Sequence, residues 1–135
     1  MNINIPDAYL EMALLNALKL KSGPVTREQL SSLKVLRAWE REIKSIEGIQ
    51  YCTGLQELFL GYNYIEDISP LKELDQIKEL YLNGNFIKDL TPISGYRHLE
   101  ILNVSHNQIK SLEPIDHLIN DSSCTVYFQH NFLEE

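Results

Sequence analysis

The sequence lacks the features that define membrane-spanning, nucleic-acid-binding and disulfide-bridged proteins. No apolar run approaches the ~18 residues that a membrane span needs. Twelve Lys and Arg stand against nineteen Asp and Glu, for a net charge of -7, and the basic residues form no cluster. Because nucleic-acid binding depends on such clusters, we expect no nucleic-acid partner. Two cysteines are too few for a disulfide scaffold.

The composition is otherwise that of an ordinary globular protein. Hydrophobic residues make up 44% and charged residues 23% of the 135 residues, which suits one compact domain. The N-terminal stretch, MNINIPDAYLEMALL, lacks the basic region and the cleavage site of a secretory signal. Together with the low cysteine content, this slightly favours a cytoplasmic location for the chain as given.

An internal repeat organises most of the chain. Leu33, Leu55, Ile77 and Leu99 each open a segment, and each lies 22 residues after the one before. A fifth, partial copy begins at Ser123 if two residues are inserted before it. The repeats therefore cover residues 33–54, 55–76, 77–98, 99–122 and 123–135. Counting from each opening residue, positions 4, 6 and 11 are apolar in every copy. Because several constrained positions recur in register, the pattern predicts a stacked repeat protein.

The residue types within a repeat predict its structure. Alternating apolar residues at positions 4 and 6 are typical of a short strand with one buried face. One such strand cannot cover its own apolar face, so we expect the coils to stack and the strands to form a parallel sheet. Proline at position 16 predicts a short helical or 3-10 return path. Asparagine at position 9 is suited to satisfying backbone groups where the chain leaves the strand. This predicted ladder consists of Asn63, Asn85, Asn107 and Asn131.

Residues 1–32 predict a helical cap that covers the N-terminal end of the repeats. Asp7 is placed as the N-cap of a helix over residues 7–21, which ends before the Ser-Gly-Pro sequence that follows. Thr26 and Gln29 have the spacing of a capping box for a second short helix. The residues expected on the buried face of the first helix are Leu10, Ala13, Leu14, Ala17 and Leu18.

These motifs resemble the internalin-like leucine-rich-repeat proteins of bacteria. The resemblance rests on VTREQLSSLKVL leading into IKSIEGIQYCTGLQELFLGYN, followed by NYIEDISPLKEL and NFIKDLTPI. It implies an α/β fold: a right-handed, curved solenoid with its parallel strands on the concave side and short helical segments on the convex side. It also implies a protein without catalysis or cofactor that binds another protein through concave side chains.

The outward-facing strand positions supply the candidate binding residues. Positions 5 and 7 place Trp39, Phe59 and Tyr81 close together, and exposed aromatic clusters often dominate binding energy at protein interfaces. The alternative is that these rings stack across strands and only stabilise the sheet. Position 10 is a weaker candidate because the turn could bury it. The remaining candidate partner-binding residues are Arg37, Glu57, Glu79, Tyr62, Tyr64 and Tyr127.

Two pairs of titratable residues are candidates for chemical sites. Glu57 and Glu79 share position 3, and a separation of about 5 Å is similar to that of retaining glycosidases. An acidic, solvated sheet edge, with Arg37 near Glu57, is the favoured interpretation. His106 and His130 share position 8, but a zinc site needs three or four ligands, so we expect no metal.

The C-terminal strand supplies the alternative function. Its sequence, TVYF, predicts a terminal strand with an unpaired edge, which could pair with a second copy of the chain or with a partner strand. The alternative is therefore a structural or regulatory subunit that assembles through this strand, as a homodimer, or through its convex side. Cys52 and Cys124 lie several coils apart, so we expect no disulfide between them.

Overall fold

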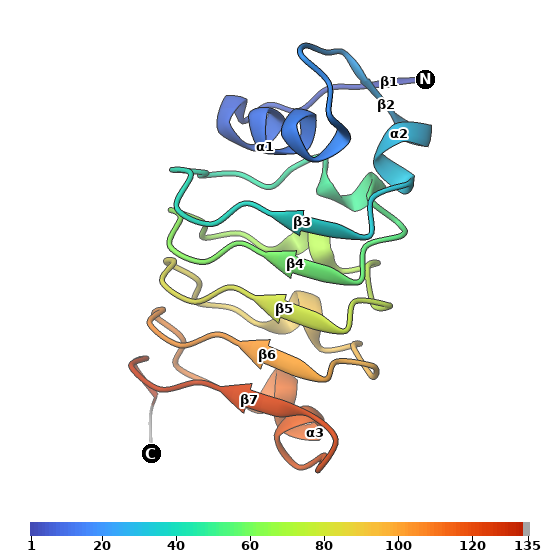
Figure 1. Ribbon diagram of the computed structural model, residues 1–135. Helices are drawn as coiled ribbons and strands as arrows, with labels where there is room; N and C mark the ends of the chain where they lie inside the picture. The colour runs from blue at the N-terminus through green and yellow to red at the C-terminus, as the bar shows by residue number, and fades with distance from the viewer. Residues whose placement is uncertain (134–135) are drawn as a thin grey trace.

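The computed structural model describes residues 1–133, which form a curved stack of five coils with a helical cap at the N-terminal end (Figure 1). Each coil contributes one strand to a parallel sheet whose order follows the chain, β3-β4-β5-β6-β7. The short helical segments lie behind the sheet. The strands are β3 (Val35–Arg37), β4 (Glu57–Phe59), β5 (Glu79–Tyr81), β6 (Ile101–Asn103) and β7 (Thr125–Tyr127).

The strand register follows the phase of the repeat. Leu36 pairs with Leu58, and the column continues through Leu80 and Leu102 to Val126. The first four of these side chains are fully buried, and Val126 on the last strand is half-buried. The predicted leucine-rich-repeat solenoid with a parallel sheet is thereby confirmed, including the two-residue insertion before the last coil.

The return path of each of the first four coils contains a short 3-10 helix. These helices are η1 (Ile49–Tyr51), η2 (Ser69–Leu71), η3 (Thr91–Ile93) and η4 (Glu113–Ile115). Proline occupies the first turn of η2, η3 and η4, where its missing N–H leaves no helical hydrogen bond unmade. The fourth return path continues from η4 into α3 (Asp116–Ile119), in the coil that carries the inserted residues.

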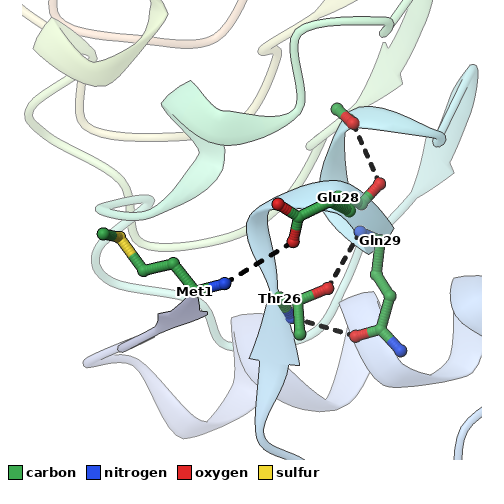
Figure 2. A network of polar contacts seen from close by, with 5 residues as sticks. Met1, Thr26, Glu28 and Gln29 are labelled. Atoms are coloured by element: carbon green, nitrogen blue, oxygen red, sulfur yellow. Dashed lines mark hydrogen bonds and ion pairs between the residues drawn. The ribbon is translucent and has the colours of Figure 1, made fainter.

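The N-terminal cap consists of two helices and a small antiparallel ribbon. Helix α1 (Ala8–Leu18) packs against β3, and α2 (Arg27–Ser31) follows β2 (Val25–Thr26). Strand β2 pairs with β1 (Asn2–Ile3), a pairing that the sequence did not predict. Figure 2 shows how α2 begins: Thr26 Oγ1 accepts the Gln29 N–H at 3.1 Å, and Gln29 Oε1 accepts the Thr26 N–H at 2.9 Å.

Asp7 joins the cap to the first coil. Its Oδ1 accepts the backbone N–H groups of Tyr9 and Leu10 at the start of α1. Its Oδ2 accepts those of Lys44 and Ser45 in the first coil, at 2.8 and 3.0 Å. Burial alone would raise the pKa of this carboxyl, but the four N–H groups lower it below its usual value.

The buried face of α1 differs in part from the expected one. Leu10, Ala13 and Leu14 are buried as expected. Leu18 is half-buried and packs against the core, also as expected. Ala17 is exposed, and Leu15, which was not expected on this face, is half-buried and packs against the core. The helix ends at Leu18, about one turn earlier than expected, with Lys19 in the left-handed conformation.

A single continuous core runs from the cap to the last coil. Tyr96 is the largest fully buried side chain, and its hydroxyl donates to the Leu71 carbonyl at 2.7 Å. Cys52 and Cys124 are free thiols in this core, and burial raises the pKa of Cys52 to about 12. The division into a cap (1–32) and repeats (33–135) stays a prediction, and the shared core makes them parts of one domain.

A column of asparagine side chains closes the turn after each strand. Asn85 Oδ1 accepts the Ile65 N–H of the preceding coil at 3.0 Å. Its Nδ2 donates to the carbonyls of Leu60 and Leu82, both at 3.0 Å. The same three bonds recur one coil before, one coil after and at the last coil, in Asn63, Asn107 and Asn131. Each asparagine therefore ties two neighbouring coils together.

Within residues 1–133, no helix is long and apolar enough to cross a membrane. The longest helix, α1, has 11 residues, against the ~20 that a membrane-spanning helix needs.

We predict that Asn85→Ala destabilises the fold by about 2–3 kcal/mol, because it leaves the buried N–H of Ile65 without a partner, at a cost of ~1–3 kcal/mol, and takes one of two amide donors from each of the Leu60 and Leu82 carbonyls. Urea unfolding measures the loss. Asn131→Ala is the matched control, since Asn131 is half-buried and water can replace its bonds. We expect it to cost about 1 kcal/mol. Equal losses in the two variants would contradict the tie between coils.

Candidate protein-binding face

The side chains at positions 3, 5 and 7 of the repeats point away from the core and form the concave face of the sheet, here called the sheet face. Position 5 forms a column in which Arg37 pairs with Phe59, Phe59 with Tyr81, Tyr81 with Asn103 and Asn103 with Tyr127. Parallel pairing in register therefore brings side chains that lie 22 or more residues apart in the sequence next to one another.

The three aromatic residues predicted as an anchor are in contact. The rings of Phe59 and Tyr81 stack with centroids 4.6 Å apart and an interplanar angle of 6°. The indole of Trp39 meets Phe59 edge-on, with centroids 5.6 Å apart. These rings contact one another across strands, as the alternative interpretation expected. Trp39 is nevertheless 46% exposed, whereas Phe59 and Tyr81 are half-buried.

Arg37 contacts the aromatic row. Its guanidinium lies over the ring of Phe59, 5.8 Å from the ring centroid, because the parallel register pairs Arg37 with Phe59 on the neighbouring strand. The arginine therefore extends the aromatic row by a cation–π contact. Arg37 forms no ion pair with Glu57, since the only ion pair among residues 1–133 joins the N-terminal amine to Glu28. Its expected proximity to Glu57 stays a prediction.

The two carboxylates beside the row are half-buried. Glu57 and Glu79 are paired in register on β4 and β5. Glu79 Oε1 accepts the hydroxyl of Tyr81 at 2.8 Å. Burial, the hydrogen bond to Glu79 and the charges of both carboxylates together raise the pKa of Tyr81 to about 12. Glu79 thus orients the tyrosine, and the two carboxylates give the sheet face an acidic border.

The tyrosines predicted at the rim lie where the chain turns away from the strands. Tyr62 is 56% and Tyr64 46% exposed, so the turn does not bury position 10. Tyr64 and Phe86 lie nearly parallel, with centroids 6.2 Å apart. All five residues at position 8 have a positive φ, which turns their side chains outward at the rim: Glu40, Tyr62, Gly84, His106 and His130.

Sequence reasoning missed two acidic residues at this rim. Glu40 and Glu42 line a hollow together with Tyr62, Asn63, Tyr64, Gly84 and Phe86. Their repeat positions, 8 and 10, are those of Tyr62 and Tyr64 in the next coil. Aligning the repeats therefore identifies Glu40 and Glu42 as rim residues. The first repeat is harder to align at this point because Arg41 replaces the asparagine of position 9.

The far end of the sheet carries Tyr127 and a stacked pair of histidines. Tyr127 on β7 is 44% exposed and two strands away from Tyr81. His106 and His130 stack with centroids 4.4 Å apart. Among residues 1–133, no cluster of three or more His, Cys, Asp or Glu is arranged to hold a metal ion.

Comparisons with known proteins agree with the fold. Residues 31–73 and 75–117 each match a family of leucine-rich repeats described as two copies. An internalin (InlF) from Listeria monocytogenes is 30% identical with a TM-score of 0.87, over 93% of this chain and 37% of that one. This chain therefore spans just over a third of that internalin.

Two further Listeria monocytogenes structures are similar. Internalin C2 is 25% identical with a TM-score of 0.58, over 96% of this chain and 77% of that one. The functional domain of InlJ is 23% identical with a TM-score of 0.74, over 95% of this chain and 28% of that one, and it supports the fold alone. No curated relative matches the chain.

Taken together, the solenoid, the asparagine ladder and the solvent-open sheet face define a bacterial repeat protein of the kind whose members are generally binding modules without catalysis. The chain belongs to the leucine-rich repeat family and is internalin-like, as the sequence motifs implied.

We predict that Tyr81 ionises at about 12, above the usual value of ~10, in an NMR titration of tyrosine labelled at Cζ. Because the folded pKa exceeds the unfolded one, the associated stability is present below pH ~10 and is lost as pH rises through about 12. Glu79→Gln, which removes a charge beside the phenol, should lower the Tyr81 pKa. Glu73→Gln, on the convex side, is the control and should leave it unchanged. The same Tyr81 pKa in the Glu79→Gln variant as in the parent would contradict the assigned contact.

Proposed function

We propose that this chain is a non-catalytic module that binds a partner protein on its sheet face, with Trp39, Phe59 and Tyr81 as the anchor. The observation that carries the proposal is the row of touching aromatic rings on the sheet, in which Trp39 is 46% exposed and Phe59 and Tyr81 are half-buried. An exposed tryptophan on the sheet contributes little to the stability of the fold, and exposed apolar patches mark interaction sites. Aromatic residues are also among those that most often dominate binding energy at interfaces. The similarity to internalins, a family of binding modules, supports the same proposal.

Binding by this surface depends on preorganisation. The rings are held by each other, by Arg37 and by the backbone register, so docking immobilises few additional rotamers and the associated entropy cost is small. Glu57 and Glu79 border the row and favour a partner segment that offers positive charge or hydrogen-bond donors. The remaining candidates, Tyr62, Tyr64 and Tyr127, would contact the edges of such a partner.

We predict that Trp39→Ala weakens binding of the partner by about 2 kcal/mol or more, as is typical of an aromatic anchor. A protein retained from a cell lysate by the immobilised chain would first be purified, and its affinity for each variant then measured by calorimetry. Tyr9→Ala is the matched control, because Tyr9 is a 49% exposed aromatic residue on α1, away from the sheet face. A retained protein whose affinity falls equally in both variants would exclude the sheet face as its binding site.

Stability measurements on the same variants separate binding from folding. Trp39→Ala and Tyr81→Ala should leave thermal melting nearly unchanged, because both side chains are partly exposed. Leu80→Ala, at the fully buried position next to Tyr81 on β5, should cost about 2–5 kcal/mol. Equal destabilisation in all three variants would assign the aromatic row to the core and would remove the reason for the proposal.

A second candidate function is assembly through β7. In the described residues, β7 pairs with β6 along one edge, and no strand covers its other edge. Val126, the core-facing residue of β7, is half-buried, whereas the core-facing leucines of the other four strands are fully buried. The Thr125 N–H donates to the Glu100 carbonyl in the neighbouring coil at 2.9 Å. Because successive backbone groups of a strand alternate in direction, the N–H of Val126 points away from β6 and is available to another strand.

We predict that any homodimer formed through this edge is abolished by Val126→Pro, which removes the outward N–H and spares the bond that Thr125 makes to β6. Sedimentation velocity at several concentrations measures the mass, and circular dichroism checks that the variant keeps its fold. A dimer that survives in a folded variant would exclude β7 as the contact. A parent chain that stays monomeric at every concentration would exclude homodimerisation altogether.

A further inference from the structure

The hollow at the rim of the first three coils has two walls of repeated positions. One wall is formed by residues at position 8 of the repeats and the other by residues at position 10. Asn63, at position 9 of the second repeat, also lines the hollow. The position 8 wall consists of Glu40, Tyr62 and Gly84. The position 10 wall consists of Glu42, Tyr64 and Phe86. In both walls the acidic residue belongs to the first coil and the aromatic residues to the next coils, so the hollow has an acidic end and an aromatic end.

Gly84 accounts for the shape of the aromatic end. Its φ of +72° is readily adopted by glycine, and a β-carbon placed there would lie 2.5 Å from Cδ1 of Tyr62. The ring of Tyr62 therefore lies over Gly84 and narrows that wall. Opposite it, the rings of Tyr64 and Phe86 are farther apart than the stacked pair on the sheet face, and they remain 46% and 42% exposed. Aromatic faces are thus open to a ligand.

The acidic end has no counter-charge in the described part of the chain. Glu40 and Glu42 are both exposed, both have a positive φ, and neither forms an ion pair within residues 1–133. Arg41 lies between them in the sequence, yet it is not part of the lining, and its backbone N–H donates to Asn63 Oδ1 at 2.9 Å. Two carboxylates therefore border the hollow without a cation of the chain to pair with.

We propose that this rim hollow is a binding site for an arginine side chain of a partner protein. A guanidinium is planar, stacks on aromatic faces and carries in-plane N–H donors that pair with carboxylates. The hollow offers both features side by side, with aromatic rings at one end and two carboxylates at the other. A lysine ammonium would use the carboxylates but would match the flat rings less well. The site lies outside the sheet face, and its test does not depend on the function proposed for that face.

The probe is N-acetyl-arginine methylamide, added to the full chain and followed by two-dimensional NMR of the backbone amides. The expected result is saturable shifts centred on Tyr62, Tyr64 and Phe86. N-acetyl-citrulline methylamide, which has nearly the same shape without the charge, should bind at least about threefold more weakly, since exposed ion pairs and cation–π contacts are each worth a factor of about two to five. An N-acetyl-lysine methylamide that binds as well as the arginine probe would overturn the preference for a guanidinium.

Variants test each end of the hollow. Glu40→Gln combined with Glu42→Gln should weaken arginine binding by about tenfold, and Tyr64→Leu by about threefold. The charge-matched control is Glu73→Gln combined with Glu113→Gln, at exposed positions on the convex side. This control should bind the probe like the parent. Equal weakening in the two double variants, shifts centred on the sheet face, or equal binding of citrulline would each overturn the site.

Discussion

The bonds that each asparagine makes across two coils are the interaction on which the rest of the structure depends. A coil of 22 residues buries a strand of only three residues, so the backbone groups just beyond the strand would face the core without partners. One amide side chain binds three of them, two in the preceding coil and one in its own coil. The first coil has Arg41 at this position and receives these bonds from Asn63. On its other side it is held by Asp7 of the cap, whose carboxylate accepts two of its backbone N–H groups.

Because this tie sets the register, it also decides which side chains meet on the surface. Every repeat position becomes a column, so a residue type that recurs at one position becomes a stack in space. The phenylalanine–tyrosine stack on the sheet face, the tyrosine–phenylalanine pair at the rim and the stacked histidines at the last coils are three examples. The candidate binding surfaces are therefore consequences of the same interaction that holds the coils together, which is why they are rigid.

Much of the fold could be predicted from the sequence, because the repeat phase alone determines which residues of successive coils lie next to one another. The strands, the 3-10 helices and the capping box all follow from local spacing, and even the inserted residues could be placed from the apolar pattern after them. The antiparallel pairing of β1 and β2 could not be predicted, because each of these strands has only two residues and so shows no hydrophobic periodicity. The position of Arg37 and the acidic end of the rim hollow depend on side-chain directions at the first coil, where the repeat departs from its own pattern.

The contacts within the aromatic row also determine how much each residue would contribute to binding a partner. Phe59 has Tyr81 stacked on its ring, Trp39 at an edge and Arg37 over its face, and it is half-buried as a result. It has little surface left to offer a partner, so its contribution is to hold its neighbours in place. Tyr81 has its hydroxyl committed to Glu79. Trp39 alone combines a large open ring with no polar commitment to another described residue, so most of the apolar area gained on docking must come from the indole. The carboxylates would then select among partners that all fit the same ring.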